Sequence, residues 1–143
     1  MGLVPGDPLA HRALDSLLRA EASVRRRLSS ELQRCGLSAS GFSVLVVLNT
    51  AGGELEMRAL RARLRMTKAN ASEVVTTLEA GGLVRRRRLL DDRRAQTVML
   101  SETGRAAVDR LFPEHTQRVA DTFSVLDEAE KRSLAQICRK LAA

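Results

Sequence analysis

The most constraining feature of the sequence is the order of segments between Leu60 and Thr103. A short Arg-rich segment with apolar residues at helical spacing leads to Thr67, a residue type that favours the N-cap of a helix. An apolar stripe of helical period follows and stops at Gly81-Gly82. Two strand-like runs, 83–90 and 95–101, then flank a turn at 90–94. This order predicts a short helix, an amphipathic helix and a basic hairpin.

A long amphipathic helix is expected ahead of this block. Residues 1–8 hold two glycines and two prolines, which oppose regular structure, so we expect a flexible tail. Leucines and valines recur near helical spacing over 9–34, and Gly36 is a C-terminal helix breaker. The fold is therefore predicted to start after residue 8.

A second helix and an extended link complete the N-terminal half. Ser38 or Ser40 can cap a mostly buried apolar helix that stops at Gly52-Gly53. Residues 54–56 read as a short extended link, and Met57 begins the apolar spacing of the next helix.

Two helices are predicted after the hairpin. Ser101 can cap a helix that starts at Glu102, with a break expected near Pro113. Asp127 can cap a last helix. The chain is thus predicted to be mainly α with a small β hairpin, an α+β fold in a single domain over 9–143.

Composition favours an anionic partner. The formal net charge is +7, and only three of the 24 cationic residues are lysines, which leaves 21 arginines. The planar guanidinium suits phosphate and guanine. A genome that prefers Arg codons is the alternative explanation for the arginines outside the hairpin. The positions of the arginines, and not their number, must therefore distinguish the two explanations.

Several classes of protein find no support in the sequence. No run approaches the roughly 20 apolar residues of a membrane span, and no export signal is evident, so we expect a cytoplasmic protein without a membrane partner. Cys35 and Cys138 lack ligand spacing and are expected to be reduced, semi-buried thiols, with no metal site. No catalytic Ser/His/Asp set, phosphate loop or HExxH motif is present, so neither an enzyme nor a cofactor is expected.

The helix that follows Thr67 has the side chains of a DNA reader. Asn70 could hydrogen-bond adenine, Lys68 could reach guanine or phosphate, and short polar residues permit close approach. The alternative is an ordinary solvated helix face. Glu73 has the wrong sign for a phosphate, and it could either accept from a cytosine amino group or pair with an arginine.

The hairpin is expected to present positive charge whatever its register. Alternation places two of the four arginines at 85–88 on each face of the strand. At the tip, Asp92 lies two residues from Arg94, close enough to orient its guanidinium for a narrow minor groove. The alternative is a surface ion pair that contributes about 0 to 1 kcal/mol.

The chain resembles the MarR family of bacterial transcription regulators. The resemblance is carried by Leu60 to Leu64, Thr67 through Val75, the segment 78–84, the Asp92-Arg93-Arg94 tip, and 98–104. It implies a winged helix-turn-helix lobe at 37–101 between long dimerisation helices at 9–35 and 102–143. It also implies that Asp92 orients Arg94 and that Arg94 inserts into the minor groove.

These observations predict a homodimeric, sequence-specific regulator of double-stranded DNA, which is either a repressor or an activator, with a repressor favoured. The apolar faces of the terminal helices are expected to be covered by a second copy, the alternative being an intramolecular helix pair in a monomer. Non-specific binding to the nucleoid or to RNA is the alternative function. The expected DNA contacts are Thr67, Lys68, Asn70, Ser72, Thr76, Arg86, Arg88, Asp92, Arg93 and Arg94.

Responsiveness to a signal is expected from the resemblance and has only weak support in the residues. A small-molecule carboxylate could be held by His11, Arg12 or Arg19, although the chain has only three aromatic residues, all Phe, to stack on a ring. His11 and His115 are expected at the surface. Oxidation at Cys35, activated by a neighbouring arginine, is the other candidate signal.

Overall fold

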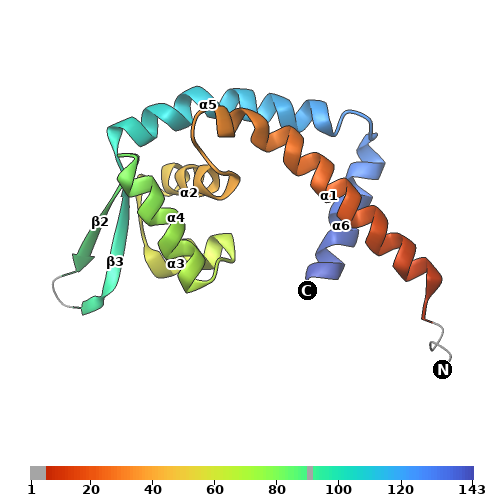
Figure 1. Cartoon of the computed structure of the whole chain (residues 1–143), viewed down its shortest axis with the longest axis horizontal. Coiled ribbons are helices and arrows are strands. Elements are labelled where there is room, and N and C mark those ends of the chain that lie inside the picture. The colour runs from red at the N-terminus through yellow and green to blue at the C-terminus, as the bar shows by residue number, and fades with distance from the viewer. Residues whose placement is uncertain (1–5, 90–91) are drawn as a thin grey trace. The chain divides into compact units, whose positions relative to one another are not determined.

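Helices make up most of the chain in the computed structural model, which describes residues 6–89 and 92–143 (Figure 1). The expected fold class, mainly α with a small sheet, is confirmed. Side chains at 89 and 92–94 lie outside the described part. The elements in chain order are α1 (Pro8–Arg34), α2 (Ala39–Thr50), β1 (Glu54–Glu56), α3 (Met57–Leu64), α4 (Lys68–Ala80), β2 (Val84–Leu89), β3 (Asp92–Leu100), α5 (Glu102–Thr122) and α6 (Glu128–Ala142).

The elements divide between two compact units. Residues 31–117 form one, which we call the winged unit, and residues up to Ser30 together with 118–143 form the other, which we call the helical unit. The winged unit thus contains the last turn of α1 and most of α5. Within the described residues, no helix is long and apolar enough to cross a membrane.

α1 begins one residue earlier than expected, and a capping residue explains why. The carboxylate Oδ1 of Asp7 accepts hydrogen bonds from the N–H groups of Leu9 (3.0 Å) and Ala10 (3.2 Å). Pro8 has no N–H to satisfy and its fixed φ suits the first helical position, so it starts the helix and does not precede it. Residues 1–5 of the expected tail lie outside the described residues.

Side-chain caps fix the starts of α2 and α4 as expected. Ser38 Oγ accepts from the N–H of Gly41 at 2.9 Å, which selects Ser38 over Ser40 as the cap. Thr67 Oγ1 accepts from the N–H of Asn70 at 3.1 Å. Between α3 and α4, Arg65 adopts the left-handed conformation (φ 52°) and completes a tight helix-turn-helix.

The sheet has three strands in the order β1-β3-β2, all antiparallel. Residues 54–56, expected to be only a link, pair with β3, with Leu55 opposite Val98. β3 also starts earlier than expected, because a register shift after Arg88 pairs Leu89 with Asp92. The backbone of 92–94 therefore belongs to a strand and not to the turn.

The core of the winged unit lies where α2, α3, α4, β2 and β3 meet. α2 is apolar around most of its circumference and is buried at three consecutive turns, as expected. Burial of these side chains is the main favourable contribution to the stability of the unit. The side chains with almost no exposure are Val44, Leu45, Leu48, Leu60, Val75, Val84 and Val98.

Three further expectations are wrong. α5 runs unbroken through Pro113. Proline lacks the N–H group that would bond to the carbonyl of Asp109. Both residues are exposed, so water can bind that carbonyl instead. Cys35 and Cys138 are exposed and not semi-buried. His115 is half-buried, because its ring packs on Phe42 in the core with 5.0 Å between centroids.

The last helix is capped as expected. Asp127 accepts from the N–H of Glu130 at 2.8 Å, and the Glu130 carboxylate accepts from the N–H of Asp127 at 2.8 Å, which forms a capping box.

Candidate nucleic-acid interface

α4 presents a narrow polar face opposite its buried stripe. Ala71, Val75 and Leu78 are buried against the core. Helical geometry therefore points Ala69, Glu73 and, at the end of the helix, Ala80 most directly outward, and all three are exposed. Sequence reasoning missed Ala69, although a helical wheel centred on the buried stripe would have found it.

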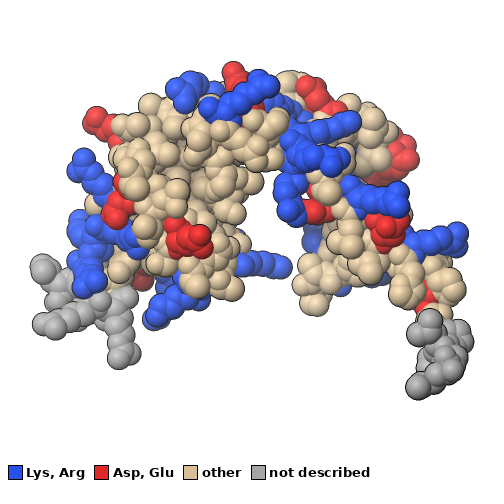
Figure 2. Space-filling model, viewed as in Figure 1, with Lys and Arg blue, Asp and Glu red and all other residues tan. Residues whose placement is uncertain are grey.

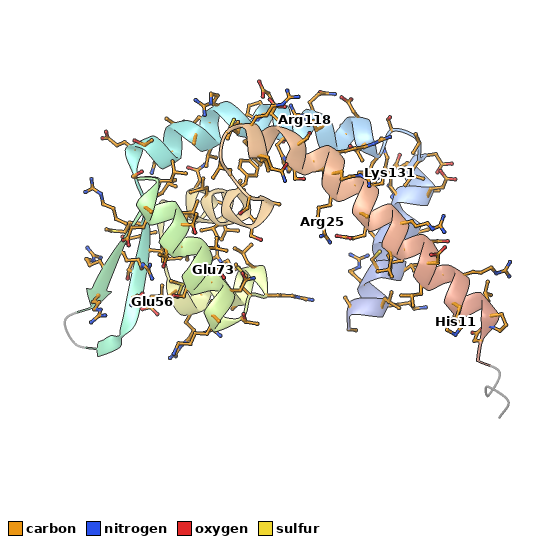
Figure 3. The ribbon with its side chains drawn as sticks, viewed as in Figure 1. His11, Arg25, Glu56, Glu73, Arg118 and Lys131 are labelled. Carbon is orange, nitrogen blue, oxygen red and sulfur yellow. The ribbon has the colours of Figure 1, made fainter. Side chains whose placement is uncertain are left out.

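The predicted contact residues of α4 lie on two flanks of this outward face. Asn70 lies on one flank, where it lines an open groove of about 390 Å³ together with the outward-facing Glu73, with Thr77 and with the N-terminal turn of α2. Glu73 is labelled on α4 in Figure 3. Ser72 and Thr76 lie on the other flank, which faces β2.

The polar groups at the start of α4 are available to a ligand. Lys68, Asn70 and Ser72 are exposed. The Thr67 hydroxyl uses a lone pair to cap the helix, which leaves its proton free of that contact and able to be donated. These four residues are brought together within the first two turns of one helix, as predicted.

The four consecutive arginines of β2 differ in their exposure to solvent. Val84 is buried, Arg85, Arg87 and Arg88 are exposed, and Arg86 is half-buried. Figure 2 shows basic side chains gathered over this hairpin. Arg87 Nη2 lies 4.0 Å from Glu54 Oε2, a pair exposed to solvent and of small energetic value.

Arg86 differs from its neighbours because it contacts α4. Its backbone N–H donates to Glu79 Oε2 at 3.0 Å, its Nε lies 3.5 Å from Glu79 Oε1, and its Nη2 donates to Thr76 Oγ1. The spacing of these residues in the sequence gives no signal of this contact, since it depends on how β2 packs on α4.

The base of the hairpin is tied to α5 through a close backbone contact. Ser101 Oγ donates to the carbonyl of Gly82 (2.6 Å), and the Ser101 N–H donates to the carbonyl of Leu83 (3.0 Å). Ser101 Oγ also accepts from the N–H of Gly104 at 3.0 Å. The turn that follows α4 is thereby fixed against the first turn of α5.

The remaining predicted residues are distributed elsewhere. The side chains of Asp92, Arg93 and Arg94 lie outside the described residues, and only their backbone is placed, in β3. His11, Arg12 and Arg19 are exposed on α1, where Arg19 Nε lies 3.0 Å from Asp15 Oδ2. Cys35 is exposed just after α1.

The imidazole of His115 is perturbed by its surroundings. Partial burial of His115 lowers its pKa from the ordinary value of 6.5, because removal from water disfavours the charged imidazolium. Its neighbour Phe42 adds an aromatic face at an interplanar angle of 58°.

Known proteins share this arrangement. A family model described as the MarR family matches residues 35–95. An HTH-type transcriptional regulator of Bacillus cereus (strain ATCC 14579) is 31% identical over 117 residues, which cover 80% of this chain and 77% of the relative.

Two solved structures extend the similarity to nearly the whole chain. Sco3205, a MarR family transcriptional regulator from Streptomyces coelicolor solved in complex with DNA, has a TM-score of 0.89 and 26% identity, with 99% of this chain and 90% of that one covered. BpsR from Bordetella bronchiseptica, whose DNA binding is regulated by 6-hydroxynicotinic acid, has a TM-score of 0.81 and 25% identity, with 92% and 99% covered. The chain belongs to the MarR family of winged-helix, DNA-binding transcriptional regulators.

Proposed function

We propose that this chain is a homodimeric repressor that recognises a specific site on double-stranded DNA. One observation carries the proposal: a helix with a polar outward face and an arginine-rich hairpin are held side by side in one winged unit. A helix of this kind fits the major groove, and a basic hairpin can reach the adjacent groove.

In this proposal, α4 contacts the bases, and the hairpin contacts the DNA backbone and the minor groove. Lys68 and Asn70 contact base edges, while the hydroxyls of Thr67 and Ser72 reach phosphates. Arg88, exposed on β2, neutralises a phosphate. At the hairpin tip, Asp92 orients Arg94 in the minor groove and Arg93 contacts the backbone, which rests on the family resemblance and on their positions in β3.

Self-association is supported by the helical unit. Large apolar side chains stay exposed along α1 and α6, and burying such surface is favourable by about 25 cal/mol per Å². A second copy of the chain is the occupant we propose, with 9–35 and 102–143 as dimerisation segments and 37–101 as the DNA-binding lobe. In the described part of the helical unit, the exposed large apolar residues are Leu9, Leu14, Leu17, Leu18, Leu134, Ile137 and Leu141 on α1 and α6, and Val125 just before α6.

We propose that the repressor acts in the cytoplasm and releases DNA when it binds a small aromatic acid. The regulation of BpsR by 6-hydroxynicotinic acid supports this class of effector. His11, Arg12 and Arg19 would hold the carboxylate. Oxidation of Cys35 is the second candidate signal, favoured by the exposure of its thiol.

Fluorescence anisotropy tests the proposed function. The chain should bind a duplex from its own promoter at least about 10³-fold more tightly than a random duplex at matched salt. Equal affinity would instead support non-specific coating of nucleic acid. Asn70→Ala should cost about 1 to 3 kcal/mol at one base pair of each half-site, and an equal loss on all sequences would show that Asn70 reads no base.

The same titrations test the hairpin and the effector. Arg94→Ala should weaken binding to the promoter duplex while the circular dichroism spectrum stays unchanged, and unaltered affinity would remove the hairpin tip from the mechanism. Addition of 6-hydroxynicotinic acid should release DNA from the wild type more readily than from Arg19→Gln, whereas identical release curves would exclude this site.

A further inference from the structure

The contact between Arg86 and α4 uses a backbone group that the sheet leaves unpaired. β2 is an edge strand, because the order is β1-β3-β2. Alternate N–H groups of an edge strand point away from the sheet and need another acceptor. At Arg86 that acceptor is the carboxylate of Glu79, with 3.0 Å between the backbone nitrogen and Oε2.

The guanidinium of Arg86 is engaged by the same helix. Its Nε lies 3.5 Å from Glu79 Oε1, and its Nη2 donates to Thr76 Oγ1. The Arg86 side chain is only 21% exposed, compared with 58% for Arg87, so most of it is covered by the protein. Reaching a phosphate would require the guanidinium to leave both of these partners.

Thr76 is committed by this network as well. Its hydroxyl donates its single proton to the carbonyl of Ser72 at 2.7 Å and accepts from Arg86. No proton remains for a phosphate oxygen or a base acceptor. Thr76 therefore serves as a link in the network, and direct donation to DNA would break it.

We propose that Arg86 is a positioning residue, which with Glu79 and Thr76 sets the angle between α4 and the hairpin and neutralises no phosphate. The inference rests on the proposed function, since it concerns how two DNA-binding elements are held for simultaneous contact. A helix and a hairpin that must enter adjacent grooves need a fixed relative orientation, and a charge-assisted link at the start of the strand provides it.

The salt dependence of DNA binding separates a positioning residue from a phosphate contact. Each neutralised phosphate contributes about 0.9 to the slope of log K against log salt concentration. Arg86→Gln should weaken promoter binding by about tenfold or more and leave the slope unchanged. The matched control Arg88→Gln, on the same strand, should reduce the slope by about 1.8 for a dimer. An equal reduction for Arg86→Gln would overturn the proposal.

A double-mutant cycle tests whether Arg86 acts through Glu79. If the two residues form one unit, Glu79→Gln and Arg86→Gln combined should weaken binding no more than Arg86→Gln alone. Additive losses would show that each residue acts independently and would contradict the proposal. Glu79→Gln also removes a negative charge near DNA. This general effect is the same in the wild type and in the Arg86→Gln background, so it cancels when the two are compared.

Amide hydrogen exchange in the DNA-free protein keeps this inference separate from the proposed function. The Arg86 amide should be protected in the wild type and should exchange at least about tenfold faster in Glu79→Ala, whereas the Val98 amide in the neighbouring strand should not change. An unprotected Arg86 amide in the wild type would refute the contact. A wild type that binds DNA without sequence preference but protects this amide would refute the proposed function alone.

Discussion

Replacing Gly104 by alanine should destabilise the winged unit at the junction between the hairpin and α5. A Cβ atom at this position would lie 2.1 Å from the carbonyl oxygen of Leu83 and 2.8 Å from Leu100 Cδ1. The Leu83 carbonyl cannot retreat freely, because it accepts the Ser101 N–H at 3.0 Å. The close approach between α5 and the turn after α4 therefore needs a residue without a side chain.

The expected magnitude follows from three contributions. Alanine would gain about 1 kcal/mol over glycine from helix propensity. Overpacking costs about 1 to 3 kcal/mol, and loss of the Ser101 hydrogen bond adds about 1 kcal/mol. The clash is with a backbone carbonyl, so the overpacking cost should lie near the upper end of its range. We therefore expect a net destabilisation of about 2 to 3 kcal/mol. For a chain of this size, the melting temperature should fall by roughly 6 to 12 °C.

Thermal unfolding followed by circular dichroism measures this effect at one fixed protein concentration, since the proposed self-association would shift the transition. Gly81→Ala is the matched control: Gly81 has helical dihedrals (φ −81°, ψ 0°), and its added Cβ would come no closer than 3.6 Å to another atom. The control should match the wild type within about 0.5 kcal/mol or exceed it. A Gly104→Ala protein as stable as the control would refute the reasoning.

Three further changes test separate parts of the structure. Thr67→Ala removes the cap on the Asn70 N–H and should lower the free energy of unfolding in urea by about 1 kcal/mol; a change under about 0.3 kcal/mol would argue against the cap. Leu14→Lys, at a residue 51% exposed, should shift the sedimentation coefficient from that of the proposed dimer towards that of a monomer, and an unaltered coefficient would favour an intramolecular helix pair. Because burial lowers the pKa of His115, the unfolded chain binds that proton more readily, so stability should fall as the pH drops through 6.5. His115→Gln should flatten this pH dependence, and an identical profile in both proteins would assign it to other groups.

Local chemistry explains which features of the fold could be predicted from the sequence. Thr67, Asp127 and Gly81-Gly82 act on the backbone within a few residues of themselves, and all three were predicted at their observed positions. The grouping of Lys68, Asn70 and Ser72 on one helix follows from the same periodicity. The early start of α1 was missed, although Asp7 followed by Pro8 is a local signal of an N-cap and first helical residue.

Features that depend on packing between distant segments could not be predicted. The pairing of Leu55 with Val98 joins residues far apart in the chain, and three residues alone have no periodicity that distinguishes a strand from a link. The contact between Arg86 and Glu79 likewise requires β2 to lie on α4. Four consecutive arginines predict a basic strand, but only the packing separates the half-buried Arg86 from the exposed Arg88.

Selection of bound duplexes from a random pool tests the central claim most directly, since the protein itself picks out its operator from all possible sequences. If two copies of the chain each place α4 in a major groove, the enriched sequences should share a pseudo-palindrome. Its half-sites should be about 10 base pairs apart, or a multiple of that spacing. A pool that remains random after repeated rounds, or a consensus without two-fold symmetry, would contradict the proposed dimeric reader of double-stranded DNA.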